Sequence, residues 1–131
     1  MDSAVIADDE FLARYVFSQS HVRADNTLRP DAFMPSPHVE LSVNRHAGCS
    51  DEQIWDFGKD IGVQRNKQLV CRGDIQTGYC RALNLEVCHA PVPGNPFHAN
   101  ITCWPVEKHA QKIIAVQIAA NAVVQYPENS V

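Results

Sequence analysis

The 131-residue sequence lacks the motifs by which most enzymes and cofactor-binding proteins are recognised. It contains no Gly-x-Ser-x-Gly, no glycine-rich phosphate loop and no dinucleotide-binding fingerprint. The His-Glu-x-x-His pattern of metalloproteases is absent, and histidines and cysteines do not occur at the tight paired spacings of zinc modules. No motif therefore reaches catalytic specificity, and the sequence predicts neither a metal nor another cofactor.

Long apolar runs and Cys-x-x-Cys pairs are also missing. No run approaches the ~18 apolar residues that are needed to cross a membrane, so we expect no membrane partner. The chain has five cysteines, an odd number, and no visible signal peptide. These features favour reduced thiols and a cytoplasmic location.

The residues that are present have the composition of one ordinary folded domain. Hydrophobic residues make up 45% of the chain and charged residues 20%, with a formal net charge of −4. A chain of this size buries a core without disulfides, and its negative charge argues against bulk nucleic-acid binding. We expect a single domain over residues 1–131, with fraying at residues 1–7 and 127–131.

Apolar periodicity and capping patterns predict three helices, of which the last is the longest. An apolar stripe after an acidic run predicts a helix at about residues 8–19. Ser50 and the glutamine three residues later form a capping-box pattern, which predicts a helix at residues 51–61. The longest pattern predicts a helix from Val106 to about Val124, with Pro105 at its first turn.

Alternation of apolar and polar residues predicts strands in four segments: residues 38–45, 68–71, 84–88 and 99–103. In the first of these, Leu41 and Val43 are expected to face the core. Arg72-Gly73-Asp74 is expected to turn the chain at the end of the second strand, and residues 75–82 fit either a turn or a short helix. This order predicts an α+β fold with a small, mostly antiparallel sheet of three to four strands, covered by three helices.

A set of arginines and histidines at element ends and in loops carries the clearest chemical signal: Arg14, Arg23, Arg29, Arg45, His21, His46 and His98. Guanidinium groups beside imidazoles can bind a phosphate and move protons without a metal. His98 and Asn100 are two residues apart on a predicted strand, so they should share a face. Arg45 ends the clearest strand and is expected to lie close to them.

Two functions remain open for this set. The first is a small cytoplasmic binding or accessory module without catalysis of its own, with a protein or a small anionic ligand as its partner. The second is a metal-independent enzyme for a phosphate-bearing substrate, ribonuclease-like or otherwise phosphoryl-handling. In that enzyme His98 and His46 would be catalytic, and Arg45, Asn100 and Arg23 would bind the substrate. If these side chains converge in one pocket, the structure favours the enzyme. If they lie apart, it favours the binding module.

Five stretches of the chain also carry a resemblance to other proteins: Leu28-Arg29-Pro30-Asp31-Ala32-Phe33-Met34-Pro35, Leu41-Ser42-Val43-Asn44-Arg45, Gln53-Ile54-Trp55, Arg72-Gly73-Asp74-Ile75, and His98-Ala99-Asn100-Ile101 with Trp104-Pro105. Together they resemble a recurring group of small bacterial proteins of unknown function, over about residues 10–125. The resemblance implies a bacterial, single-domain, intracellular protein. It implies no activity, cofactor or partner.

Overall fold

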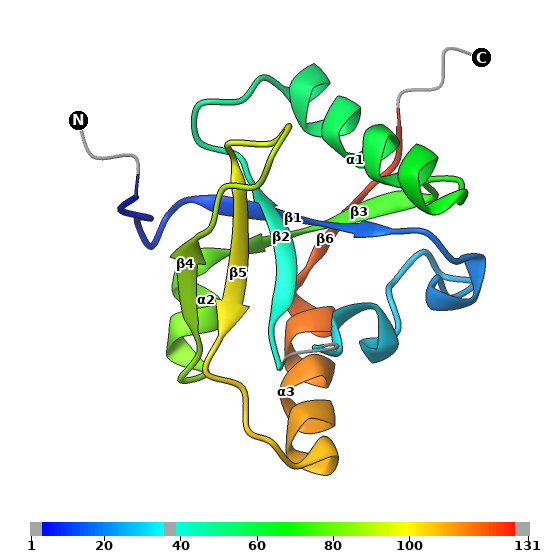
Figure 1. Cartoon of the computed structure of the whole chain (residues 1–131). Helices are drawn as coiled ribbons and strands as arrows, with labels where there is room; N and C mark the ends of the chain where they lie inside the picture. The colour runs from blue at the N-terminus through cyan, green and yellow to red at the C-terminus, as the bar shows by residue number, and fades with distance from the viewer. Residues whose placement is uncertain (1–3, 36–38, 128–131) are drawn as a thin grey trace.

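A single β-sheet with helices on both faces organises the computed structural model, which describes residues 4–35 and 39–127 (Figure 1). Six strands form one sheet in the order β4-β5-β2-β1-β3-β6, and each neighbouring pair is antiparallel. The strands are β1 (Phe11–Val16), β2 (Leu41–Arg45), β3 (Cys71–Gln76), β4 (Glu86–His89), β5 (His98–Thr102) and β6 (Val123–Gln125). The helices are α1 (Asp51–Arg65), α2 (Thr77–Ala82) and α3 (Lys108–Asn121).

The α+β class and the antiparallel sheet agree with the prediction, but the predicted count of three to four strands is too low. The prediction missed β1 and β6, and its strand at residues 68–71 shares only Cys71 with β3. β1 lies inside the segment predicted as a helix, and β6 lies at the end of the last predicted helix. The predicted start of β2 at His38, and the fraying at residues 1–3 and 128–131, lie outside the described residues. Ile6, which was also expected to fray, is buried in the core.

The helix predicted at residues 8–19 is wrong, because this segment is the strand β1 between β2 and β3. Leu12 and Val16 face one apolar cluster, whereas Ala13 and Tyr15 face another on the opposite side. A strand that is buried on both faces does not alternate between apolar and polar residues. Its apolar positions therefore happened to match the spacing of a helical stripe.

The turn predicted at Arg72-Gly73-Asp74 is also wrong, because all three residues lie within β3 and are buried. Gly73 explains part of this arrangement. A Cβ at this position would lie 2.9 Å from Leu28 Cδ1 and 3.0 Å from Phe33 Cζ. The glycine therefore lets the loop before β2 pack directly against the sheet, where Phe33 is completely buried.

The last helix is shorter than predicted. It begins at Lys108 rather than beside Pro105, and Val106 is 87% exposed. Its buried residues are two alanines and two larger side chains: Gln111, Ala115, Ile118 and Ala119. The valines of β6 continue the apolar helical pattern in sequence, yet they pair with β3. Of residues 75–82, which were predicted as a turn or a short helix, residues 77–82 form the short helix α2, whereas Ile75 and Gln76 belong to β3.

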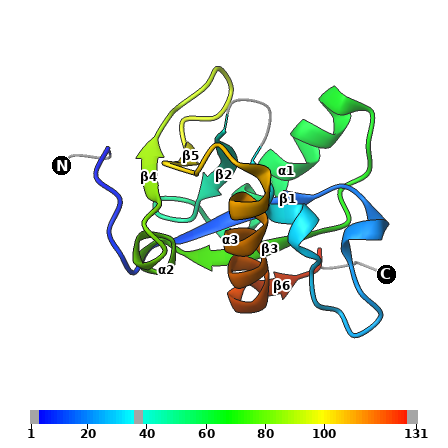
Figure 2. The same ribbon diagram turned by 90° about the horizontal axis from the view of Figure 1, so that it is seen from below.

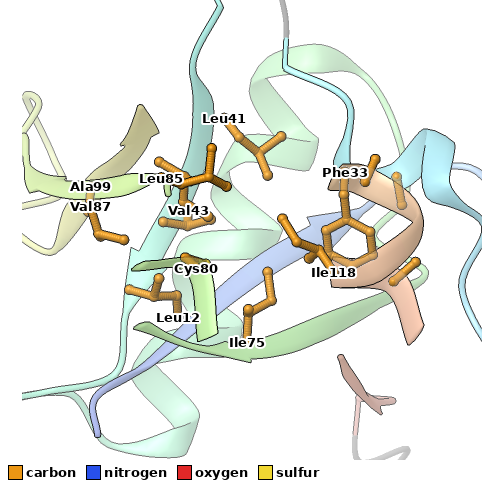
Figure 3. Packing of buried hydrophobic residues seen from close by; sticks show 14 of the residues in the cluster. Leu12, Phe33, Leu41, Val43, Ile75, Cys80, Leu85, Val87, Ala99 and Ile118 are labelled. Carbon is orange, nitrogen blue, oxygen red and sulfur yellow. The ribbon is translucent and has the colours of Figure 1, made fainter. Parts of the chain in front are cut away.

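Two apolar clusters lie on opposite faces of the sheet. The larger one joins the sheet to α2, α3 and the turn at residues 30–33, and it includes the predicted core residues Leu41 and Val43 (Figure 3). The smaller one joins β1 to α1. Seen from below, α3 and α1 lie on the two sides of the strands (Figure 2). Within residues 4–35 and 39–127, no helix has the length and apolar character required to cross a membrane.

The capping box predicted for α1 is confirmed. Ser50 Oγ accepts a hydrogen bond from Gln53 N at 3.1 Å, and Gln53 Oε1 accepts one from Ser50 N at 2.8 Å. The helix ends at Arg65, four residues later than predicted, where Asn66 takes a left-handed conformation with φ of 56°. Gly62 lies within the helix, at a position where a Cβ would come within 2.6 Å of Lys67 O, so it permits close contact with the following loop.

Substituting Gly58 with alanine should destabilise the fold through the contact between α1 and β1. A Cβ here would lie 2.6 Å from Tyr15 Cε1, and the Tyr15 hydroxyl is held by a hydrogen bond to Ile54 O. Overpacking costs about 1–3 kcal/mol, and the better helix propensity of alanine offsets at most about 1 kcal/mol. Thermal melts should show a lower Tm for Gly58→Ala and little change for the exposed Lys59→Ala. Equal melting of Gly58→Ala and wild type would refute this packing.

The five cysteines should separate by reactivity, because all are free and only Cys88 and Cys103 are exposed. Burial raises the pKa of Cys71 to about 11 and that of Cys80 to about 12, and it also raises the pKa of Cys49. The thiolate is the reactive form. Titration with a chromogenic disulfide should therefore give two fast equivalents in the native protein and five after denaturation. Fewer than five in denaturant would contradict the free-thiol arrangement.

Candidate functional site

The sheet is sharply bent between β1 and β2, which cross at a steep angle (Figure 1). The two strands pair only at Leu12–Arg45 and Ala13–Asn44, although each continues beyond these pairs. Arg14 occupies the gap that their divergence leaves. Its Nε donates to Ala32 O at 2.9 Å, and its Nη1 donates to Ser42 O at 3.0 Å. The guanidinium thus satisfies backbone carbonyls at the point where the strand ladder stops.

A pocket of about 270 Å³ lies beside this gap, between α1, the strands β1 and β2, and the loop before β5. Its lining includes the aromatic rings of Tyr15, Phe17 and Phe57, together with Arg14, Arg65 and His98. Tyr15 and Phe57 are held by packing within the smaller apolar cluster. The mixture of an apolar wall and a few polar groups is typical of small-molecule sites.

The pocket carries an excess of positive charge. Its lining contains Arg14, Arg65 and one carboxylate, that of Asp60. Neither arginine forms an ion pair with any residue in the described ranges. Burial lowers the pKa of Arg14 to about 10, with a smaller contribution from the positive charge of Arg65. Arg14 remains charged at neutral pH, so two guanidinium groups without carboxylate partners face the same small space.

A pair of buried asparagines holds the loop that forms one wall of the pocket. Asn95 Nδ2 donates to Asn44 Oδ1 at 2.7 Å, and Asn44 Nδ2 donates to Arg45 O at 2.9 Å. Phe97 N in turn donates to Asn95 Oδ1 at 2.9 Å. Because each amide group is satisfied in the interior, the loop has one well-defined position over β2.

The hydrogen bond of His98 determines its tautomer. His98 Nδ1 lies 2.8 Å from Ala90 O, and a carbonyl oxygen can only accept, so Nδ1 carries the proton. In the neutral ring, Nε2 is then a hydrogen-bond acceptor. This nitrogen has no protein partner among residues 4–35 and 39–127. His98 therefore contributes an unused acceptor to the residues around the pocket.

The structure confirms that His98 and Asn100 share a face of β5, where they pair with Asn44 and Ser42 of β2. The side chain of Arg45 does not join them. It lies on the other face, where Nε and Nη2 donate to the Glu10 carboxylate at 2.7 and 2.9 Å. These bonds raise the pKa of Arg45, and its side chain is only 6% exposed.

The other two predicted site residues lie elsewhere. His46 Nε2 is 3.1 Å from Asp74 Oδ1, in a network with Arg72, which stacks on Trp55 near the start of α1. Arg23 Nη1 donates to Leu28 O at 3.1 Å within a surface turn. The five predicted residues therefore do not converge in one pocket, and only His98 lines the pocket described above. Their functional roles stay predictions.

Sequence reasoning placed Arg14 in the chemical set but on a helix, and it did not single out Arg65 or Asn95. Arg65 lies in the last turn of α1, where a basic residue is ordinary. Asn95 lies in a proline-rich loop, where asparagine is also common. Neither position carries a local signal, because the pocket forms only when α1, β1 and the loop meet.

Neither a metal site nor a known relative gives this pocket an identity. Among the residues that the structure describes, no three His, Cys, Asp or Glu side chains are grouped so that they could hold a metal ion. A comparison of the chain with protein-family models, curated proteins and solved structures found no match. The function of the pocket is therefore inferred from the geometry of its residues alone.

Removing the Asn95 side chain should release the pocket loop while leaving the sheet intact. Asn95→Ala leaves the buried Asn44 Oδ1 and the Phe97 amide without their partners, which costs about 1–3 kcal/mol. Hydrogen exchange at Phe97 should become faster, and the Tm should fall. In the control Asn100→Ala, only one contact of 3.5 Å to Ser42 is lost, so little should change. Unchanged exchange at Phe97 would show that other contacts hold the loop.

Proposed function

We propose that this protein is a small binding module, without catalysis of its own, that holds a small anionic ligand in the pocket beside Arg14. The single observation that carries the proposal is the pair of arginines in one small pocket, neither with a carboxylate partner in the described chain. Two neighbouring cations repel each other, and a bound anion would relieve that repulsion. Guanidinium groups also bind carboxylate and phosphate groups through paired N–H donors.

The separation of the predicted catalytic residues supports a binding role over an enzymatic one. His98 lies at the pocket, whereas Arg45 is paired with Glu10 on the other face of the sheet and His46 is paired with Asp74. A general acid or base needs its substrate-orienting groups within reach of the same reacting atom. The pocket residues instead form a shaped, positively charged space around an apolar wall.

A cytoplasmic location is part of the same proposal. All five cysteines are free, including the two on the surface. Free surface thiols fit a reducing compartment, where small metabolites bearing carboxylate or phosphate groups are also abundant.

Titration with simple anions tests the proposal. Sodium acetate and inorganic phosphate, added to isotope-labelled protein at low ionic strength, should shift the backbone amide resonances of the pocket loop, such as those of Gly94 and Asn95. The variant Arg65→Ala should weaken these shifts, because it removes an exposed guanidinium from the lining. Lys112→Ala removes a cation on α3, outside the pocket, and should leave them unchanged.

The proposal fails if neither anion shifts the loop resonances, or if Arg65→Ala and Lys112→Ala behave alike. The second result would mean that the anions only screen surface charge. A salt titration with sodium chloride at matched ionic strength provides the reference for that comparison.

A further inference from the structure

The aromatic residues in the wall of the pocket indicate a ligand with an apolar part, and not only an inorganic anion. Phe17, Phe57 and Tyr15 all contribute rings to the lining. The Tyr15 hydroxyl donates to Ile54 O, so Tyr15 offers the pocket its ring alone. Phe57 is held in a tilted contact with Phe97, with ring centroids 5.8 Å apart. A phosphate or acetate ion would leave this apolar surface in contact with water, whereas a ring would cover it.

The pocket is of a size that suits a small ligand. Its volume of about 270 Å³ lies just below the range of about 300–1,000 Å³ that is typical of drug-sized ligands. A single six-membered ring with its substituents fits within such a space. Arg65 already stacks on Phe17, with its Cζ 5.8 Å from the ring centroid, so the cationic end and the aromatic wall adjoin.

Polar groups lie at two separated points along β2. Arg14 donates to Ser42 O, and its Nη2 has no hydrogen-bond partner in the part of the chain that the structure describes. His98 pairs with Asn44, two residues further along the strand. Two residues of an antiparallel strand span roughly 7 Å, so the backbone positions of β2 beside Arg14 and beside His98 are about as far apart as the opposite substituents of a benzene ring.

We infer that the ligand of this pocket is a single-ring aromatic carboxylate that carries a hydrogen-bond donor on the opposite side of the ring. The carboxylate lies against Arg14 and Arg65, the ring lies against the aromatic wall, and the donor meets His98 Nε2. Nε2 is the acceptor because Nδ1 donates to Ala90 O. This inference depends on the proposed anion-binding function and adds the class of ligand.

Three matched carboxylates test the inference by isothermal titration: 4-hydroxybenzoate, benzoate and cyclohexanecarboxylate. Benzoate should bind more tightly than cyclohexanecarboxylate, because only the planar aromatic ring stacks on the wall. 4-Hydroxybenzoate should bind about fivefold more tightly than benzoate, which corresponds to one neutral hydrogen bond. These comparisons use the wild-type protein, so they do not depend on the stability of any variant.

Two variants test which residue binds each end of the ligand. His98→Ala should lose the roughly fivefold preference for 4-hydroxybenzoate over benzoate. Arg65→Ala should weaken all three carboxylates by a similar factor. A melt of each variant, with Lys112→Ala as the control, shows whether the fold is retained.

Each alternative outcome has a separate meaning. Equal binding of benzoate and cyclohexanecarboxylate, both sensitive to Arg65→Ala, would overturn the aromatic class and leave the anion-binding function standing. Equal binding of 4-hydroxybenzoate and benzoate to wild type would overturn the role of His98. Absence of binding by every carboxylate and by inorganic phosphate would overturn both the inference and the proposed function.

Discussion

The bend between β1 and β2 is the constraint on which the rest of the structure depends. After two residue pairs the strands separate, and the ladder between them no longer supplies hydrogen bonds. From the gap, Arg14 donates to Ser42 O of β2 and to Ala32 O of the turn at residues 30–33. One side chain thereby connects β1, β2 and the turn at residues 30–33. The same bend creates the space that α1 and the loop before β5 enclose as a pocket.

The walls of that space are held by short-range packing and by buried polar bonds. Gly58 lets α1 approach the ring of Tyr15, and the capping box determines where the helix starts. On the other side, Asn44 and Asn95 fasten the loop to β2 through bonds that are inaccessible to solvent. Buried amides restrict the loop more than apolar contacts would, because any other position leaves them unsatisfied. The pocket is therefore largely formed before any ligand arrives.

Local sequence patterns predicted the orientation of side chains correctly in elements that have one face exposed to solvent. Leu41 and Val43 alternate with polar residues and are core residues as predicted, and Ser50 caps α1 as predicted. His98 and Asn100 share a face for the same geometric reason. The sequence pattern was misleading for β1 and β3, which are central strands. In β1 apolar residues occupy both faces, so they do not alternate with polar residues. In β3 polar residues do alternate with the others, but Arg72 and Asp74 are buried and hydrogen-bonded to each other.

The sequence by itself determined the α+β class, the strand β2, the start of α1 and the absence of long apolar runs. Each of these depends on residues within a few positions of one another. Only the tertiary structure decided that Arg14 and Arg65 face one pocket, and that Arg45 belongs to Glu10 on the opposite face. The direction of a long side chain depends on which partners the fold brings near it. Glu10 and Arg45 are thirty-five positions apart in the chain, so no local pattern encodes their pairing.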